Sequence, residues 1–435
     1  MAEPSRRAMI AIVVSVVLVL SGIAAVVVPG LLTSTATPPT AAPSSQSPSP
    51  APSTSTRSPS PTPSSTAARP GPSPSAAPPP PPPPPQSRAQ QLLASMTLEQ
   101  RAGQVVMTSV PVSGLDAASL AALGSDHIGN VFLKGRTMAG AAPVADVVRA
   151  ARAQATPAAT LGVAPFVATD QEGGQVQILR GPGFSDMPSA LAQGTMAPGA
   201  LRTAAAEWGR ELAAVGVDVN FAPVMDTVPS AAFAPQNVPI GRYQREFGFT
   251  PDDVAAHGVA FAEGMADSGV EATVKHFPGL GRVTANTDTS TNVTDSVTTR
   301  NDPYVVPFAD AVHAGAPWVM LSNAFYPAID PNNYAVFSPT VIQGMLRGDL
   351  GFKGIVISDD ICDATQVSGF LLDHRGADFL AAGGTMVLCS DQTRAPLVWQ
   401  GIVDRARSDP GFAKIVDAAA LAVLEAKDRA GLLPH

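Results

Sequence analysis

The residues best suited to chemistry lie in one stretch, Ala272–Ser290, with the sequence ATVKHFPGLGRVTANTDTS. An apolar lead-in runs directly into Lys275 and His276, and a proline and two glycines then interrupt any regular element. This order is typical of a buried strand that ends in a loop. A cation, an imidazole and the downstream carboxylate of Asp288 therefore follow one strand end. Such a set can bind polar groups and transfer protons.

Apolar segments of strand length recur along the chain, separated by alanine-rich segments with helical spacing such as Ala205–Val215 and Pro251–Ser268. Continuous apolar strands that alternate with helices indicate a parallel sheet buried on both faces. Eight such units predict an α/β fold of the (β/α)8, or TIM-barrel, type. No GxGxxG motif opens a helix after the first strand, which argues against a dinucleotide-binding fold. The predicted strands are Gly103–Val110, His127–Gly135, Phe166–Glu172, Val217–Asp226, Ala272–Gly279, Trp318–Phe325, Gly354–Asp360 and Thr385–Ser390.

Polar side chains follow the predicted strands and should gather at one mouth of the barrel, where the C-terminal strand ends meet. This mouth is acidic, with a few cations, and we predict neither a metal nor a cofactor, because no His/Cys cluster of metal spacing and no phosphate-binding glycine-rich loop is evident. Paired carboxylates suit glycosidic bond chemistry, in which one attacks the anomeric carbon and an acid protonates the leaving oxygen. The mouth residues are Lys134, Asp170, Glu172, Asp226, Lys275, His276, Asn323, Asp359, Asp360, Ser390 and Asp391.

Five short motifs occur in a fixed order along the chain. They are Ser95–Gly103 (SMTLEQRAG), Thr169–Gly174 (TDQEGG), Asn220–Asp226 (NFAPVMD), Lys275–Gly281 (KHFPGLG) and Ser358–Asp360 (SDD). With them, the segment from Arg88 to Leu433 resembles the single-barrel bacterial β-N-acetylglucosaminidases of glycoside hydrolase family 3, and most of all the exported mycobacterial type. The resemblance implies a retaining mechanism through a covalent glycosyl–enzyme intermediate. It also implies removal of terminal β-linked N-acetylglucosamine from peptidoglycan-derived material.

Asp359 matches the nucleophile of this family. An aspartate at the end of the apolar segment GIVIS is placed at the mouth, and an ionised carboxylate is the right attacking group. The structural alternative is an ion-paired or helix-capping aspartate. Asp360 points the other way in an extended chain, so we expect it to cap the next helix.

The sugar-binding residues of the family match four polar side chains of this sequence. A carboxylate can accept hydrogen bonds from sugar hydroxyls, and the cations can donate to them. Arg242 competes with Arg245 for one of these roles, and Glu172 reads as a supporting partner. The alternative for the lysine and histidine is a structural pair that braces neighbouring carboxylates. The predicted substrate-binding residues are Asp170, Arg245, Lys275 and His276.

The usual proton donor of the family is missing. It is a histidine on the loop after KHFPG, oriented by an aspartate two residues earlier, and this sequence has Asp288 and Asn286 at those positions. One hypothesis makes Asp288 the provisional acid/base, positioned by Asn286. A second gives the role to another carboxylate, such as Glu172 or Asp295. A third makes the protein a weakly active or non-catalytic sugar-binding protein.

Two other enzymes fit the same barrel, a β-glucosidase and a glycoside phosphorylase. The cysteines leave a separate question open. Cys362 follows the seventh predicted strand and Cys389 ends the eighth. Because neighbouring strands lie about 4.8 Å apart, the two can form a disulfide in an oxidising compartment. The alternative is a pair of buried free thiols.

The N-terminal fifth of the chain is not expected to fold with the barrel. Arg6 and Arg7 precede an apolar run long enough to cross a bilayer, so residues 1–29 read as a signal anchor or a cleaved signal peptide. The arginines should stay inside, which places the rest outside the cytoplasm. Residues 30–87 are rich in Pro, Ser, Thr and Ala and predict a disordered linker. Residues 88–435 form the predicted catalytic barrel.

The totals agree with a large globular domain that binds no nucleic acid. The chain has 435 residues, of which 45% are hydrophobic, and a formal net charge of -8. No basic run with interleaved aromatic residues appears. The expected partners are therefore a carbohydrate substrate and, through the N-terminal segment, a membrane. The expected protein is an exported monomer, either membrane-anchored or secreted.

Overall fold

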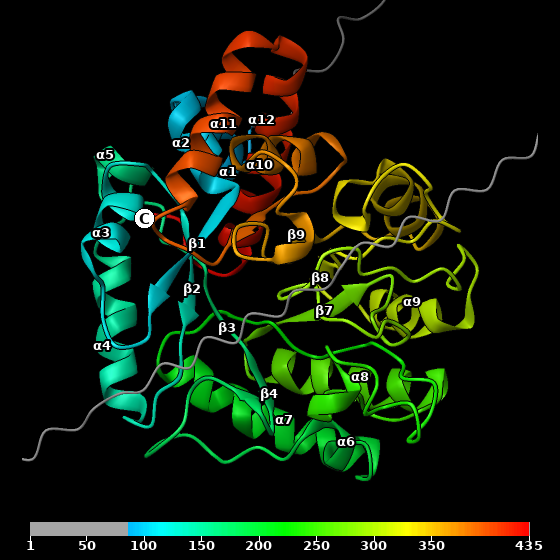
Figure 1. Cartoon of the computed structure of the whole chain (residues 1–435). Helices are drawn as coiled ribbons and strands as arrows, with labels where there is room; N and C mark the ends of the chain where they lie inside the picture. The colour runs from blue at the N-terminus through cyan, green and yellow to red at the C-terminus, as the bar shows by residue number, and fades with distance from the viewer. Residues whose placement is uncertain (1–85, 435) are drawn as a thin grey trace, which may run out of the picture. The chain divides into compact units, whose positions relative to one another are not determined.

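The computed structural model describes residues 86–434, which form a parallel barrel-like sheet surrounded by helices (Figure 1). The predicted anchor or signal peptide, and the linker up to residue 85, lie outside the described residues. Within residues 86–434, no helix is both long enough and apolar enough to span a bilayer.

The eight predicted strands are all present and all pair in parallel, in the order β10-β1-β2-β3-β6-β7-β8-β9. The prediction of an eight-stranded α/β barrel is therefore confirmed for the described part of the chain. A short antiparallel pair, β4 (Gln171–Gly173) and β5 (Val176–Gln177), stands outside the barrel sheet. The barrel strands are β1 (Val106–Pro111), β2 (Asn130–Lys134), β3 (Val167–Thr169), β6 (Val219–Asn220), β7 (Glu271–Phe277), β8 (Trp318–Leu321), β9 (Ile355–Ser358) and β10 (Val387–Cys389).

The barrel closes between its two end strands, β9 and β10. Ile357 and Met386 form a parallel bridge there. The backbone nitrogen of Ser358 donates to the Met386 carbonyl at 3.1 Å, and that of Ile361 donates to the Leu388 carbonyl at 3.1 Å. This seam joins the strand that precedes Asp359 to the strand that ends at Cys389.

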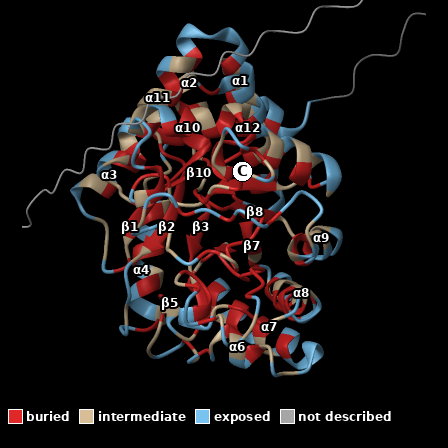
Figure 2. Ribbon diagram, turned by 45° about the vertical axis from the view of Figure 1, so that its right-hand side comes forward, coloured by how far each residue is buried: buried red, intermediate tan, exposed pale blue. Residues whose placement is uncertain are grey.

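Helices cover the outside of the barrel, and Figure 2 shows buried strands within helices whose outer faces are exposed. Short 3₁₀ turns span Gly241–Tyr243, Pro303–Val305, Ala335–Phe337 and Thr365–Val367, and a π-type helix spans Thr340–Asp349. The α-helices are α1 (Arg88–Ser95), α2 (Leu98–Gln104), α3 (Ala117–Gly124), α4 (Ala141–Arg152), α5 (Pro157–Thr160), α6 (Ala190–Gln193), α7 (Pro198–Ala214), α8 (Pro251–Asp267), α9 (Val306–His313), α10 (Leu372–Ala381), α11 (Ala395–Ser408) and α12 (Pro410–Arg429).

The helix α8 shows how local sequence fixes these elements. The Thr250 hydroxyl caps its first turn by accepting from the Asp253 nitrogen at 3.1 Å, and Pro251 occupies the first helical position. Its buried face packs against α7, where Gly264 allows close approach. A β-carbon at Gly264 would lie 2.4 Å from the Arg202 carbonyl oxygen and 2.6 Å from the Ala205 β-carbon. Any larger residue would therefore push these two helices apart.

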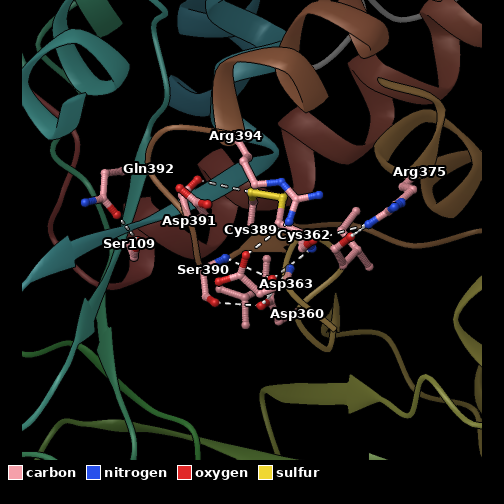
Figure 3. The surroundings of a disulfide bond; sticks show 12 residues. Ser109, Asp360, Cys362, Asp363, Arg375, Cys389, Ser390, Asp391, Gln392 and Arg394 are labelled. Carbon is pink, nitrogen blue, oxygen red and sulfur yellow. Dashed lines mark hydrogen bonds and ion pairs between the residues drawn. A yellow bond between two sulfur atoms is a disulfide. The ribbon is translucent and has the colours of Figure 1, made fainter. Parts of the chain in front are cut away.

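The two cysteines form a disulfide, with their α-carbons 5.0 Å apart (Figure 3). Cys362 follows β9 and Cys389 ends β10, so the bond lies across the seam that closes the barrel. Beside it, the Asp360 carboxylate accepts from the backbone nitrogen and the hydroxyl of Ser390, at 3.0 and 2.6 Å. The covalent bond and the two hydrogen bonds hold together the two loops that follow these strands.

Removing this disulfide should lower the free energy of unfolding by roughly 3.5 kcal/mol, because the 27-residue separation of the cysteines closes a loop in the unfolded chain. The measurement is urea unfolding with and without reductant. These are the only two cysteines in the sequence, so the double variant Cys362→Ala/Cys389→Ala is the control, and reductant should leave its midpoint unchanged. An oxidised wild type with the same midpoint as this variant would contradict the expectation.

Candidate active site

A cavity of about 300 Å³ opens at the C-terminal ends of the barrel strands. Its wall includes the apolar side chains of Phe132, Phe221 and Met320. All the predicted catalytic and substrate-binding residues line this one cavity: Asp170, Arg245, Lys275, His276, Asp288 and Asp359. Side chains that are far apart in the sequence thus meet here, as the barrel assignment predicts.

Four charged groups on one side of the cavity form an alternating network. Lys275, at the end of β7, is buried and places its Nζ 2.6 Å from an Asp170 oxygen and 2.7 Å from a Glu172 oxygen. Arg245 donates to both Glu172 oxygens, from Nε at 2.8 Å and Nη2 at 2.7 Å. Arg245, rather than the exposed Arg242, is therefore the arginine of the cavity. We name Asp170, Glu172, Arg245 and Lys275 the charge network.

The electrostatics of the charge network keep Glu172, Arg245 and Lys275 ionised. Burial opposes the charge of Glu172, but Arg245 and Lys275 outweigh it and lower the pKa of Glu172 to about 2. Burial likewise opposes the charge of Lys275, yet Asp170 and Glu172 raise the pKa of Lys275. Glu172 is almost fully enclosed, whereas Asp170 keeps 25% of its side chain exposed. Asp170 is thus the carboxylate of the network that can accept hydrogen bonds from a ligand.

The carboxylate of Asp226 holds His276. Asp226 was predicted to lie at the barrel mouth, but no role was predicted for it. Asp226 is fully buried, and its Oδ2 lies 2.7 Å from Nδ1 of His276. Its other oxygen accepts from the backbone nitrogens of His276 at 3.2 Å and Leu280 at 2.8 Å. Asp226 therefore fixes the orientation of the imidazole and the turn that follows it. The available signal was an aspartate at the end of a predicted strand, but its partner lies 50 residues away.

The turn after His276 is fixed by its glycines and by a buried leucine. Gly279 has a φ of 134°, which favours glycine, and a β-carbon at Gly281 would lie 1.7 Å from the Thr227 carbonyl oxygen. Leu280 is buried, and its carbonyl accepts from the Asn237 side chain at 2.8 Å. Leu280 therefore anchors the start of the loop.

Asp359 immediately follows β9 and is half-buried in the cavity wall. The pKa of Asp359 is raised to about 6: burial is the largest cause, His276 lowers the pKa, and Asp288 raises it. One Asp359 oxygen accepts from the Asp360 nitrogen at 2.8 Å. The carboxylate thus lines the cavity and is surrounded by groups that influence its ionisation.

Asp360 does not cap a helix, so that prediction was wrong. Its carboxylate accepts from the backbone nitrogens of Cys362 at 2.9 Å and Asp363 at 3.2 Å, and from Ser390 as described above. A turn follows β9 directly and α10 begins only at Leu372, so the aspartate stabilises the turn and the seam instead.

Asp288 lies on the loop after β7 and is exposed to the cavity. The Asn286 side chain accepts from the Asp288 backbone nitrogen at 2.9 Å, so Asn286 fixes the backbone at this point. The other two donor candidates have different surroundings. Asp295 is buried and accepts from Val297 and Thr298, and it is not part of the cavity wall. Glu172 is ionised, paired with Arg245 and Lys275, and not part of the cavity wall. Of the three carboxylates, only Asp288 faces the cavity.

With Asp359 as the predicted nucleophile, the rate of the first step should rise with pH through an apparent pKa near 6, because only the ionised carboxylate can attack. The measurement is kcat/KM against pH on an aryl glycoside with an activated leaving group. Asp288→Asn should move this midpoint to lower pH, because the charge of Asp288 raises the pKa of Asp359. A wild-type midpoint at the ordinary aspartate value of about 3.9, or no movement in the variant, would contradict the assignment.

In the described part of the chain, no group of three or more His, Cys, Asp or Glu side chains is arranged to hold a metal ion. A closed parallel barrel whose mouth carries a charge network and further carboxylates is the architecture of a (β/α)8 enzyme with a pocket for a small polyhydroxylated ligand.

The family model of the glycosyl hydrolase family 3 N-terminal domain matches residues 97–423. The chain belongs to this family. A β-hexosaminidase of Stenotrophomonas maltophilia (strain K279a) is 36% identical over 274 residues, covering 60% of this chain and 76% of that protein. The crystal structure of a β-N-acetylhexosaminidase from Beutenbergia cavernae DSM 12333 matches with a TM-score of 0.76 and 48% identity, over 77% of this chain and 99% of that chain.

A third similar structure, M tuberculosis LpqI, has a TM-score of 0.67 at 24% identity, over 78% of this chain and 95% of that chain, and shares the fold. Together these similarities show that the protein is a family 3 glycoside hydrolase of the β-hexosaminidase type. The hypothesis of a non-catalytic protein is set aside, and the homology implies a carbohydrate substrate that contains N-acetylglucosamine.

Proposed function

We propose that the protein is a retaining exo-β-N-acetylglucosaminidase that removes terminal N-acetylglucosamine from peptidoglycan-derived material. The observation that carries this proposal is the shared cavity, which holds the Asp359 carboxylate, the charge network and a second free-facing carboxylate, Asp288. The cavity volume of about 300 Å³ is at the lower end of ligand pockets. This size suits one terminal sugar better than an internal segment of a polymer.

The proposed reaction has two displacement steps. In the first, an Asp359 oxygen forms a bond to the anomeric carbon while the bond to the leaving oxygen breaks, and the acid form of Asp288 gives that oxygen its proton. In the second, ionised Asp288 takes a proton from water, the water oxygen attacks the anomeric carbon, and the Asp359 ester bond breaks. Two inversions give net retention.

The charge network and His276 hold the sugar in this proposal. Asp170 accepts hydrogen bonds from sugar hydroxyls, while Arg245 and Lys275 donate to them. Glu172 keeps the two cations at a fixed spacing, and Asp226 fixes the imidazole. The positions of these donors and acceptors are set before the substrate arrives, which lowers the entropic cost of orienting it.

The test uses the purified wild-type chain and three substrates: an aryl β-N-acetylglucosaminide, an aryl β-glucoside, and a peptidoglycan disaccharide with terminal N-acetylglucosamine. We expect turnover of the first and third, weak turnover of the second, and a β-anomer as the first product seen by NMR. A preference for the glucoside would favour a β-glucosidase. A sugar phosphate formed when phosphate is added would favour a phosphorylase. Release of the α-anomer would exclude the retaining mechanism.

We also propose that the protein is exported and acts on the outer side of the cell membrane. The disulfide supports this location, because such bonds persist in oxidising compartments. The apolar N-terminal run after Arg6 and Arg7 supports it independently. Fractionation of cells that produce the full chain should find the protein in the membrane or the medium, and recovery from the cytoplasm alone would refute export.

A further inference from the structure

The loop that carries Asp288 is attached to a distant segment of the chain. The residues that make this attachment are Thr365 and Gln366, in the 3₁₀ turn after β9. The Asp288 carbonyl accepts from the Thr365 nitrogen at 3.1 Å and from the Thr365 hydroxyl at 2.8 Å. The Gln366 nitrogen donates to the Thr287 carbonyl at 3.0 Å. The attachment therefore acts on the peptide groups on either side of the Asp288 α-carbon.

The Gln366 side chain adds a second point of attachment. It is buried, and its amide makes two hydrogen bonds to Val293: its oxygen accepts from the Val293 nitrogen and its nitrogen donates to the Val293 carbonyl, both at 2.9 Å. The Gln366 amide thus binds both backbone groups of Val293, as a residue of a neighbouring strand would. The loop from Thr287 to Val293 is consequently held at both ends by two consecutive residues. We name Thr365 and Gln366 the latch.

The latch is itself joined to the nucleophile. It follows Asp359 by six and seven residues in the chain, and between them lie Asp360 and Cys362, which are tied to the end of β10 by hydrogen bonds and by the disulfide. Asp359 and the latch thus belong to one short segment, which the hydrogen bonds of Asp360 and the disulfide hold in place. Any movement of the latch changes the placement of Asp288 relative to Asp359.

We propose that Thr365 and Gln366 are positioning residues that hold Asp288 over the bond to be broken. This role rests on the proposed function of Asp288 as acid/base. Neither side chain lines the cavity, so their effect passes through the loop backbone. A proton donor must lie within hydrogen-bond reach of the leaving oxygen, and misplacement by about 1 Å can cost on the order of a hundredfold in rate.

The main test is the variant Thr365→Val, which keeps the shape of the side chain and removes one hydrogen bond to the Asp288 carbonyl. We expect kcat/KM on a substrate with a poor leaving group to fall roughly tenfold, with little change on a dinitrophenyl glycoside, whose departure needs no proton. Thr365→Ser retains the hydroxyl and should restore the wild-type rate. A second variant, Gln366→Leu, should show the same selectivity. Equal losses on both substrates, or no loss on either, would overturn the proposal.

The matched control is Thr195→Val, because the exposed Thr195 hydroxyl makes a similar bond to the Ala192 carbonyl at 2.8 Å, far from the loop in sequence. It should leave the rate on both substrates unchanged. A control variant with the same selectivity as Thr365→Val would show that the effect is not specific to the latch, and would overturn the proposal.

A double-variant cycle separates failure of the latch from failure of the acid/base assignment. If Thr365 acts through Asp288, then Thr365→Val should have no further effect in an Asp288→Ala background. Additive losses would overturn the positioning role while leaving Asp288 as the acid. An Asp288→Ala variant without leaving-group selectivity would refute the assignment of Asp288, and the latch proposal with it. Hydrogen exchange of residues 287–293 gives a further readout, and should be faster in Gln366→Leu than in the wild type.

Discussion

Replacing Asp359 by asparagine should abolish turnover of every substrate, with a loss of roughly three orders of magnitude or more in kcat. The amide has nearly the same shape as the carboxylate, so the cavity keeps its form, but it cannot form the ester bond to the anomeric carbon. The loss should be the same for activated and unactivated leaving groups, because both require the attacking oxygen. The measurement is steady-state hydrolysis of a dinitrophenyl and a methyl N-acetylglucosaminide.

A matched control for this variant is Asp391→Asn. Asp391 follows the next strand and was also predicted at the mouth, but it is not part of the cavity wall. Its carboxylate accepts from the nitrogen and hydroxyl of Thr393, and its variant should retain activity. Trapping with a 2-fluoro sugar gives direct evidence, since the adduct should map to Asp359 by mass spectrometry. An adduct on another residue would refute the assignment of Asp359 as the nucleophile.

Replacing Asp288 by alanine should produce a loss that depends on the leaving group. General acid catalysis contributes roughly 10²- to 10⁴-fold, so kcat/KM on an unactivated disaccharide should fall by that factor. On a dinitrophenyl glycoside kcat/KM should change little, because this leaving group departs as a stable anion. The measurement is kcat/KM for a series of aryl glycosides whose phenol leaving groups become less and less acidic. The kcat/KM of the variant should depend more steeply on the acidity of the leaving group than that of the wild type.

The second step of the reaction gives an independent check on Asp288. Without a base, water attacks the glycosyl–enzyme slowly, so the intermediate should accumulate on activated substrates and kcat should fall. Azide needs no base, and adding it should restore kcat and yield a β-glycosyl azide. Asp295→Asn is the control, because its carboxylate is engaged with Val297 and Thr298. If Asp295→Asn showed the leaving-group dependence and Asp288→Ala did not, the proton donor would be Asp295.

The fold was readable from the sequence because its signals are local. Each barrel strand is a short apolar run between helical segments, and the start of α8 is marked by Thr250 and Pro251. The grouping of Asp170, Lys275 and Asp359 followed from the barrel alone, since its geometry brings strand ends together whatever their separation in the chain. The boundaries of the strands were predicted less accurately. The predicted strand Val217–Asp226 is longer than β6, which spans only Val219–Asn220.

The contacts that orient the site could not be read in the same way. The pairing of Asp226 with His276, and of Glu172 with Arg245, depends on the directions of side chains from segments far apart in the sequence. Asp360 has an ordinary capping pattern, and only the path of the chain after β9 shows that it stabilises a turn. The attachment of Asp288 to Thr365 spans 77 residues and involves a backbone carbonyl, which has no sequence signature.

The disulfide has a consequence for any comparison of enzyme samples. Cys362 lies three positions after Asp359, the proposed nucleophile, and bonds to the far side of the barrel seam. Protein folded in the reducing cytosol of a production host and protein matured after secretion share one sequence but differ in covalent structure beside Asp359. Two turnover numbers obtained from such samples would describe two chemical species, and the oxidation state of each batch belongs with every reported rate.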